Sequence, residues 1–335
     1  MVVSPNTPLS YVNVMTQFRF ENNKNMTHKL DDFIQYALDA QPISGTSLII
    51  SLYGDALSHR GGEIWLGSLS LLLEPMGFSD RFVRTSVFRL QKEGWLEVEK
   101  IGRRSYYRIT ERGMNQFRHA ESKIYLSEQP AWDGKWDLLL LEESNKEERS
   151  RLKKELSWLG FGQLNGTLMA APSSSQSDIP ALLGELNASD SVIYFRADYP
   201  YPRSEQSLKE RVSASWSLDQ VAQHYHEFII SFRPLMKLLQ DCNTDELTPE
   251  RCFQLRLLLI HFYRRVVLRD PLLPNVLLPA QWEGQIARHL CINIYQRIGP
   301  AATRYISEQC ETTIGKLPQP AAAYYRRFGG LRSGT

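Results

Sequence analysis

The sequence predicts a multidomain α+β protein with an N-terminal winged helix-turn-helix, a central ferredoxin-like α+β domain and a mainly α-helical C-terminal domain. Three observations lead to this fold class. A basic helix followed at once by a short hairpin occupies 79–109, short strands and helices alternate over 137–198, and long helical runs follow from Ser204 onward. With 335 residues, the chain is long enough for two or three domains.

The basic helix is expected over Asp80–Lys92, between a capping residue (Ser79 or Asp80) and the helix-ending Gly94. Its apolar positions recur at helical spacing and predict one buried face, made of Val83, Val87 and Leu90. The opposite face combines cations, a hydroxyl and a ring: Arg81, Arg84, Thr85, Phe88 and Lys92, with Arg89 at its margin. Arginine forks suit guanine edges and phosphates, and threonine suits phosphates or a thymine methyl group, so this face is a candidate reading surface for DNA.

A hairpin directly follows this helix. Residues 95–100 and 105–109 alternate as strands, and Arg103 and Arg104 lie in the turn between them. A basic helix with such a hairpin is typical of a winged helix-turn-helix, with the arginines at the tip of the wing. The alternative is an ordinary helix with a solvated charged face and an edge hairpin; helix, wing and arginines together favour DNA binding.

The rest of the N-terminal region supplies the scaffold for this pair. A first helix is expected over Thr27–Asp39, and a second, capped by Ser44 or Thr46, runs through Tyr53. The segment Glu63–Glu74 is apolar almost all round, which predicts a buried scaffold helix. Residues 1–26 are polar and are expected to be a flexible extension.

Beyond the wing, a charged helical connector is predicted over Thr110–Leu126. Strands at 137–141, 163–171 and 191–198, with helices at 146–159 and 178–187 between them, give a β-α-β-α-β order that indicates a ferredoxin-like domain. Three long helices are then expected at about 204–240, 248–269 and 279–309. The predicted boundaries are 1–26, 27–110, 111–130, 131–203 and 204–335.

The helix at 248–269 is apolar except for a polar stripe in which Gln254, His261 and Arg265 share one narrow sector, with Arg264 beside it. A buried arginine needs an anionic partner. One alternative is that acids on neighbouring helices, such as Glu283 or Asp270, neutralise these side chains. The other is that the side chains of the stripe line a cationic pocket. The basic-aromatic run 324–330 is expected to be a solvated tail.

Composition narrows the function classes. The formal net charge is only +2, so DNA binding requires a local patch. The four cysteines form no CxxC pair, so neither a zinc finger nor a redox motif is supported, and reduced, cytoplasmic thiols are the simplest interpretation. No apolar run reaches the about 18 residues of a transmembrane helix, and no signal peptide is recognisable. No P-loop, Rossmann glycine pattern, Gly-x-Ser-x-Gly elbow or HExxH motif supports an enzyme.

Seven segments, spread through all three domains, resemble the PaaX-type regulators, the phenylacetic acid degradation repressor family. They are PISGTS (42–47), GDALSHRGGEIW (54–65), RFVRT (81–85), EGWL (93–96), IGRR (101–104), PAWDGKW (130–136) and HFYRRVV (261–267). The resemblance spans roughly 27 to 330. It implies a repressor of aromatic catabolism genes, a homodimer on palindromic operators, a central domain similar to that of the Cas2 nucleases, and phenylacetyl-CoA as the effector, with no cofactor.

From this family we carry over the reading helix (Arg81, Arg84, Thr85 and Arg89) and the wing (Arg103 and Arg104) as DNA-binding residues. A CoA thioester carries several negative charges, so its site needs clustered cations near aromatic surface. The candidates are His261, Tyr263, Arg264 and Arg265, helped by Tyr295, Arg288 and Arg297, with Lys135 and Trp136 joining if the pocket lies between domains. The alternative is a sensor of a different aromatic acyl-CoA that acts partly through protein contacts.

Two further expectations concern the central domain. A single winged helix makes too few base contacts for operator specificity, so a dimer is needed, and we place its contact within about 131–200. Cas2-like folds carry an aspartate near their first strand that can hold a metal. Here Asp133 stands next to Lys135 and away from other carboxylates, so we expect a turn or cap residue and no metal site.

Overall fold

The computed structural model describes residues 26–331, apart from 41, 130, 143–145, 174–178, 199–204 and 243–245. These residues form two compact units. The first unit contains the described residues up to Ser127, together with His226–Arg265 and those from Ile286 on; the second contains Glu128–Tyr225 and Val266–Gln285. The N-terminal winged helix therefore packs as one body with helices from the end of the chain. The predicted extension 1–26 lies outside the described residues, apart from Met26.

The helices of the N-terminal region agree with the periodicity of the sequence. They are α1 (Met26–Asp39), α2 (Gly45–Leu52), α3 (Leu66–Leu73) and α4 (Asp80–Lys92), and α2 continues into a π-helical turn, Tyr53–Leu57. Ser79 caps α4, because its Oγ accepts a hydrogen bond from the backbone N–H of Phe82 at 3.3 Å. Gly77, with φ +83°, makes the turn between α3 and α4. Ser44 occupies the N-cap position of α2 without a side-chain capping bond.

The prediction of one helix over Glu63–Glu74 is wrong in its first turn. Glu63–Trp65 is instead a strand, β1, which pairs with β3 (Arg104–Ile109). Strand β2 (Leu96–Ile101) completes a three-stranded sheet of order β1-β3-β2. Gly61 and Gly62 have φ angles of +85° and +67°, which direct the chain into the sheet before α3 begins. The wing sheet thus includes a third strand, β1, which lies between α2 and α3 in the sequence. After the wing, Thr110 caps the next helix, α5 (Glu111–Ile124).

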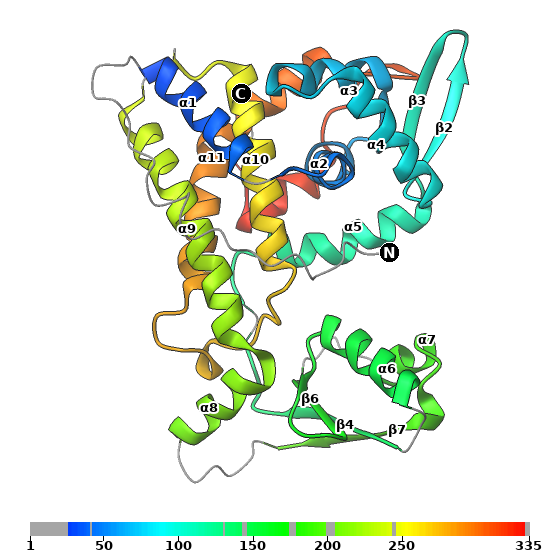
Figure 1. The fold of residues 1–335 in the computed structure, drawn as a ribbon, viewed down its shortest axis with the longest axis vertical. Coiled ribbons are helices and arrows are strands. Elements are labelled where there is room, and N and C mark those ends of the chain that lie inside the picture. Colours follow the sequence, from blue (N-terminus) through cyan, green and yellow to red (C-terminus); the bar gives the residue numbers. More distant parts are fainter. Residues whose placement is uncertain are drawn as a thin grey trace. The chain divides into compact units, whose positions relative to one another are not determined.

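The rest of the first unit is mainly helical. Helices α9 (Leu218–Asp241), α10 (Pro249–Val267) and α11 (Glu283–Gln309) contribute to it and are followed by a small hairpin, β8 (Glu311–Thr312) and β9 (Gly315–Lys316), and a 3₁₀ segment, Tyr324–Gly329. The predicted helix 204–240 is divided at Ser217 (φ +52°) into α8 (Glu205–Trp216) and α9. The prediction of a solvated tail is wrong, because Tyr324, Arg327 and Phe328 are buried. Figure 1 shows α10 beside α2 within this unit.

The second unit contains the ferredoxin-like domain. Its strands are β4 (Trp136–Leu141), β5 (Gly162–Gln163), β6 (Leu168–Pro172) and β7 (Val192–Ala197), with helices α6 (Lys146–Trp158) and α7 (Ile179–Glu185). The antiparallel sheet has the order β5-β6-β4-β7. The predicted strand 163–171 is divided by a turn in which Asn165 Oδ1 accepts from the backbone N–H groups of Thr167 and Leu168. This addition gives the β-α-β-β-α-β order of the ferredoxin-like fold.

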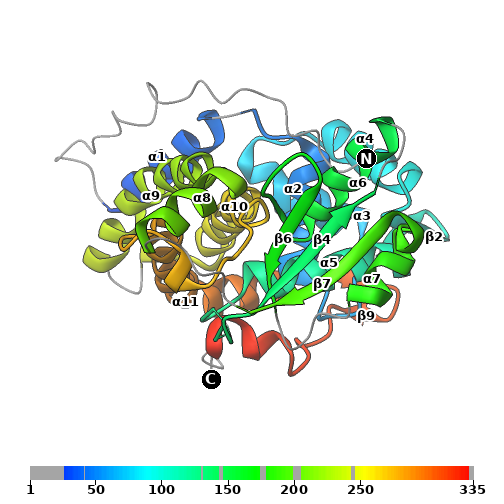
Figure 2. The same ribbon diagram turned by 90° about the horizontal axis from the view of Figure 1, so that it is seen from below.

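The two faces of this sheet differ. One face packs Leu139, Leu141 and Met169 against helices α6 and α7. On the other face the ring of Trp216 from α8 lies against Gly162 and 6.0 Å from the ring of Trp136. Toward β7 the second face is open: Ile193 and Phe195 are 42% and 49% exposed. Figure 2 views β6, β4 and β7 side by side. Within the described part of the chain, no helix is long and apolar enough to cross a membrane.

Candidate nucleic-acid interface

Helix α4 separates its apolar and polar residues as the sequence predicted. Val83, Val87 and Leu90 are fully buried, whereas the opposite side exposes Arg81, Arg84, Thr85, Phe88, Arg89 and Lys92. Thr85 donates its hydroxyl hydrogen to the carbonyl oxygen of Arg81 at 2.8 Å, which leaves its methyl group and oxygen lone pairs available to a partner. Figure 1 shows α4 beside the wing strands β2 and β3. The six side chains therefore share one continuous outer face of a helix-turn-helix.

The arginines of this face fall into two groups. Arg84 is held by Asp80, its Nε lying 2.5 Å from the carboxylate, and Asp80 also accepts from the Ser70 hydroxyl at 2.7 Å. The hydrogen bond from Arg84 lowers the pKa of Asp80, so this carboxylate stays charged and keeps the guanidinium oriented. Among the described residues, the side chains of Arg81 and Arg89 have no hydrogen-bonding or ionic partner. They are free to meet phosphates or base edges without breaking an internal bond.

At the tip of the wing the two arginines also differ. Arg103 is exposed and has no ionic partner within the described part of the chain. Arg104 forms an ion pair with Glu311 of the β8–β9 hairpin, and its guanidinium carbon lies 4.3 Å from the centroid of the Trp65 ring. The hairpin is tied to the sheet elsewhere too, since Glu63 Oε1 accepts from the backbone N–H and the hydroxyl of Thr313, both at 2.7 Å. The C-terminal hairpin thus anchors the wing sheet at both Arg104 and Glu63, which no local sequence pattern indicated.

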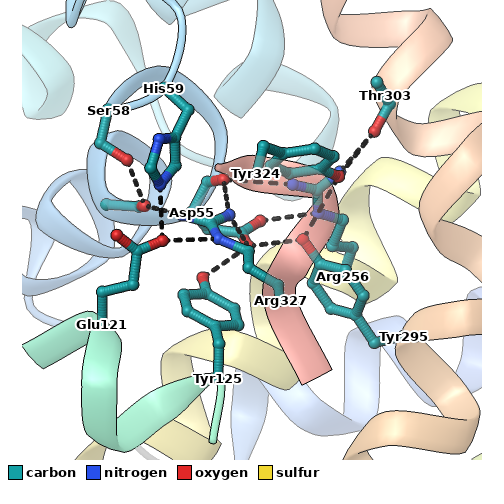
Figure 3. A network of polar contacts seen from close by, with 11 residues as sticks. Asp55, Ser58, His59, Glu121, Tyr125, Arg256, Tyr295, Thr303, Tyr324 and Arg327 are labelled. Carbon is teal, nitrogen blue, oxygen red and sulfur yellow. Dashed lines mark hydrogen bonds and ion pairs between the residues drawn. The ribbon is translucent and has the colours of Figure 1, made fainter. Parts of the chain in front are cut away.

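A buried polar network centred on Asp55 connects the winged helix to the C-terminal helices (Figure 3). Asp55 is 4% exposed and lies on the π-helical turn after α2. Its carboxylate accepts from the hydroxyl groups of Tyr125 at 2.7 Å and Tyr295 at 2.9 Å, and from Arg256 Nε at 2.7 Å. Burial alone would lower the pKa of Arg256, but Asp55 and the neighbouring tyrosines raise it well above its usual value.

Arg327 forms the second half of this network. Its Nη1 donates to the backbone carbonyl of Asp55 at 2.6 Å, and its Nε donates to Glu121 Oε1 at 2.8 Å. Glu121 also meets His59 Nε2 at 2.6 Å. Burial raises the pKa of Glu121, but His59 and Arg327 more than offset this effect and hold the pKa below its usual value. The stabilisation from Glu121 is therefore complete above the unfolded carboxyl pKa and is lost as the pH falls through the folded value.

The candidate effector residues of α10 do not all face one way. Arg264 donates from Nε to the Ser51 hydroxyl at 2.7 Å and from Nη2 to the Ser47 hydroxyl at 2.8 Å, both on α2. His261 Nδ1 lies 3.1 Å from the same Ser51 hydroxyl. Tyr263 packs elsewhere, with its ring centroid 5.3 Å from that of Phe228 on α9. The structure thus brings His261 and Arg264 together against the helix-turn-helix and separates Tyr263 from them.

Arg264 has no carboxylate partner among the described residues. Burial and the neighbouring charge of Arg265 lower the pKa of Arg264 to about 10. Burial and Arg264 likewise lower the pKa of His261 well below its usual value, so this histidine is neutral at pH 7. Asp270, one of the acids considered as a partner, accepts a hydrogen bond from the Tyr225 hydroxyl at 2.7 Å. The positive charge of Arg264 is therefore not compensated by a carboxylate of the described residues.

The remaining candidates lie elsewhere. Tyr295 belongs to the Asp55 network, Arg297 donates to the Cys242 carbonyl at 3.3 Å, and Arg288 is buried. In the second unit, Lys135 is exposed and Trp136 is buried, 5.4 Å from Trp132 by ring centroids. Asp133 Oδ1 accepts from the backbone N–H of Lys135 at 2.9 Å, as expected of a turn residue. No cluster of three or more metal-ligating side chains occurs in the described ranges.

A helix-turn-helix with an exposed cationic helix, joined to a ferredoxin-like domain and a helical region, defines a multidomain transcription regulator. Three family models match in this order: "PaaX-like protein" at 44–113, "PaaX protein central Cas2-like domain" at 129–209 and "PaaX-like protein C-terminal domain" at 216–308. The chain is 58% identical over 303 residues to the transcriptional repressor PaaX of Escherichia coli strain K12, which covers 90% of this chain and 96% of that relative. The chain belongs to the PaaX-like family and is a close homologue of a transcriptional repressor.

A solved structure, the uncharacterized protein Rv0674 from Mycobacterium tuberculosis, is also similar. It is 20% identical, covers 70% of this chain and 90% of its own, and superposes with a TM-score of 0.46.

Proposed function

We propose that this chain is a transcriptional repressor of phenylacetate catabolism genes that binds operator DNA as a homodimer and is released by phenylacetyl-CoA. The observation that carries the proposal is the outer face of α4, in a chain closely related to a repressor. On this face the side chains of Arg81 and Arg89 are exposed and have no partner among the described residues. Electrostatic contacts to phosphates position such a helix, and contacts to base edges supply specificity. A repressor acts where its operator lies, so we place it in the cytoplasm.

The test of this function uses the full-length protein. Duplexes that it retains are selected from a random pool, and release from the selected duplex is measured while phenylacetate, CoA and phenylacetyl-CoA are added separately. We expect phenylacetyl-CoA to release the DNA at a concentration at which phenylacetate alone and CoA alone have no effect. Neither of these two compounds can make the contacts of the phenyl ring and of the CoA phosphates together. Selection of no sequence would contradict operator binding. Release only by another aromatic acyl-CoA would favour the alternative effector.

For the effector site we propose the cluster around Arg264. This cluster, His261, Arg264 and Arg265, offers positive charge or hydrogen bonds to a phosphate. Arg264 and His261 contact Ser47 and Ser51, which belong to α2, the second helix of the DNA-binding domain. An anion bound there competes with the two serine hydroxyls for Arg264 and so changes the support of the helix-turn-helix. Tyr263, Lys135 and Trp136 remain candidates for contacts with the uncharged parts of the ligand.

Arg264→Ala and Arg265→Ala should bind the selected duplex but require at least about tenfold more phenylacetyl-CoA for release, because each removes a charge-assisted contact to the ligand. Release is followed by fluorescence anisotropy of labelled DNA. Arg251→Ala is the matched control, since Arg251 lies on the same helix and pairs with Asp31 at its exposed end. A folded double variant released at the wild-type ligand concentration would contradict the site. Unfolding of both single variants would instead assign these arginines to structure.

For the dimer we propose the open face of the central sheet, formed by Leu138, Leu140, Ile193 and Phe195. Phe195 lies opposite Leu138, and Ile193 opposite Leu140, on neighbouring strands β7 and β4. Apolar side chains that are this exposed and adjacent are a feature of interfaces. An isologous contact between two copies of one face produces the two-fold symmetry that a palindromic operator requires.

Phe195→Asp should convert the full-length dimer to a monomer, because the interface would bury two unpaired carboxylates. Light scattering coupled to size exclusion measures the mass at micromolar concentrations. Leu159→Asp is the control and should leave the dimer intact. Leu159 is an apolar residue that is 45% exposed and lies just before β5, the edge strand farthest from β7 in the sheet order. A dimer that persists in Phe195→Asp would show that the interface lies on another surface. A wild-type protein that is monomeric would contradict the proposed dimer.

A further inference from the structure

The exposed face of α4 has an aromatic residue near its middle. Phe88 is 54% exposed, although it lies on a helix whose other apolar residues Val83, Val87 and Leu90 are fully buried. The helical repeat places Phe88 directly opposite this core face, two turns after Arg81 and one turn before Lys92. Arg84 and Arg89 lie toward the two edges of the same face. The cations therefore surround an apolar centre.

The ring of Phe88 is also oriented. Lys92 Nζ lies 4.7 Å from the ring centroid, in the geometry of a cation–π contact, and covers one face of the ring. With Lys92 in this position, Phe88 is still 54% exposed to solvent. Lys92 thus brings a positive charge next to the ring, where a phosphate can meet the ammonium group while the ring approaches the bases. This pairing distinguishes Phe88 from an apolar residue that is only incidentally at the surface.

The partner that fits such a ring can be deduced from the chemistry of the major groove. Base edges in that groove present hydrogen-bond donors and acceptors, together with one apolar group, the 5-methyl group of thymine. A phenyl ring cannot satisfy the donors and acceptors, and covering them would cost free energy. Contact with a methyl group removes apolar surface from water on both sides.

We propose that Phe88 is a specificity-determining residue whose ring contacts the 5-methyl group of a thymine in each operator half-site. This inference rests on the proposed function, because it requires α4 to enter the major groove. The contact favours thymine over cytosine at that position, since cytosine lacks the methyl group and offers an amino donor to the ring. The surrounding arginines set the position of the helix, and the ring selects the base.

The experiment replaces each thymine of the selected duplex, one position at a time, with deoxyuridine. This change removes only the methyl group and preserves base pairing and every hydrogen-bonding atom in the groove. For the wild-type protein we expect one position in each half-site at which affinity falls about three- to tenfold, the range expected for one apolar contact. Phe88→Ala should bind the thymine duplex more weakly and should show no difference between thymine and deoxyuridine at that position.

Two controls separate this inference from the proposed function. Arg81→Ala should bind all duplexes more weakly yet retain the deoxyuridine effect. Phe88→Leu, which keeps an apolar group, should retain part of it. Suppose that the loss of affinity at each deoxyuridine position is the same for wild type and Phe88→Ala, while Arg81→Ala binds more weakly. This result would refute the proposed role of Phe88 but not the docking of α4 on DNA. If neither variant changes binding, the docking of α4 itself is wrong. Phe88 is exposed, so both of its variants should fold, which circular dichroism verifies.

Discussion

Replacing Asp55 with alanine should lower the free energy of unfolding by about 3–5 kcal/mol, the usual cost of removing one partner from a buried ion pair. Asp55 and Arg256 are only 4% and 2% exposed as side chains, so water cannot replace the lost carboxylate. The variant would leave Arg256 without a carboxylate contact among its described partners and would also remove the acceptor for the hydroxyl groups of Tyr125 and Tyr295. Each unsatisfied buried group adds to the cost.

Urea denaturation followed by circular dichroism measures this effect. Asp31→Ala is the matched control, because Asp31 pairs with Arg251 at a partly exposed position, with side chains 47% and 23% exposed, and solvent-exposed pairs contribute about 1 kcal/mol or less. The network is not a structural requirement if Asp55→Ala unfolds at the same urea concentration as Asp31→Ala. The comparison also tests whether the winged helix depends on the C-terminal helices, since Asp55 and Arg256 come from these two parts.

Replacing Arg84 with alanine should weaken operator binding by about 1–3 kcal/mol if Arg84 contacts a base, equivalent to roughly 5- to 150-fold in the dissociation constant. Asp80 holds Arg84 Nε at 2.5 Å, which leaves the two terminal nitrogen atoms of the guanidinium for a bidentate contact. Fluorescence anisotropy with selected and unrelated duplexes measures the loss. It should be larger for the selected duplex, because a base contact exists only there.

The wing should behave differently. Arg103→Ala should weaken binding to every duplex and reduce the salt dependence of affinity, as expected when one phosphate contact is lost. Arg104 must leave Glu311 to reach a phosphate, so Arg104→Ala should cost less than Arg103→Ala. Arg118→Ala, an exposed arginine on α5 that donates to Asn115, is the control for a general change in charge. Wild-type affinity in both Arg84→Ala and the Arg103→Ala, Arg104→Ala double variant would refute this docking model.

The parts of the fold that the sequence predicted well are those encoded by neighbouring residues. The capping of α4 by Ser79, its end near Gly94 and its buried stripe all depend on contacts within a few positions along the chain. The β-strand at Glu63–Trp65 was missed because its apolar residues also fit a helix, and only pairing with Tyr106–Arg108 favours the strand.

The candidate site was less predictable, since its contacts join distant residues. Asp55 and Arg327 are separated by 272 positions, and nothing in the run 324–330 distinguishes an arginine that meets a buried carbonyl from one in solvent. The exposed face of α4 could be predicted, and so could the pairing of Arg84 with Asp80, because residues four positions apart are neighbours on a helix. The partner of Arg104 could not be predicted. Glu311 is an ordinary acidic residue in the sequence, and only the fold places it against Arg104.

The Asp55 network also determines the stage of synthesis at which the chain can fold into a form that binds DNA. The winged helix emerges from the ribosome before the C-terminal helices. Arg256, which neutralises Asp55, and Arg327, which donates to the backbone carbonyl of Asp55, are synthesised later, Arg327 near the end of the chain. An unfinished polypeptide therefore contains the whole reading helix without the buried cations that stabilise its scaffold. Chains cut short before Arg327 should consequently be poor competitors for the operator, and the DNA-binding region is unsuited to transfer onto another protein as an independent module.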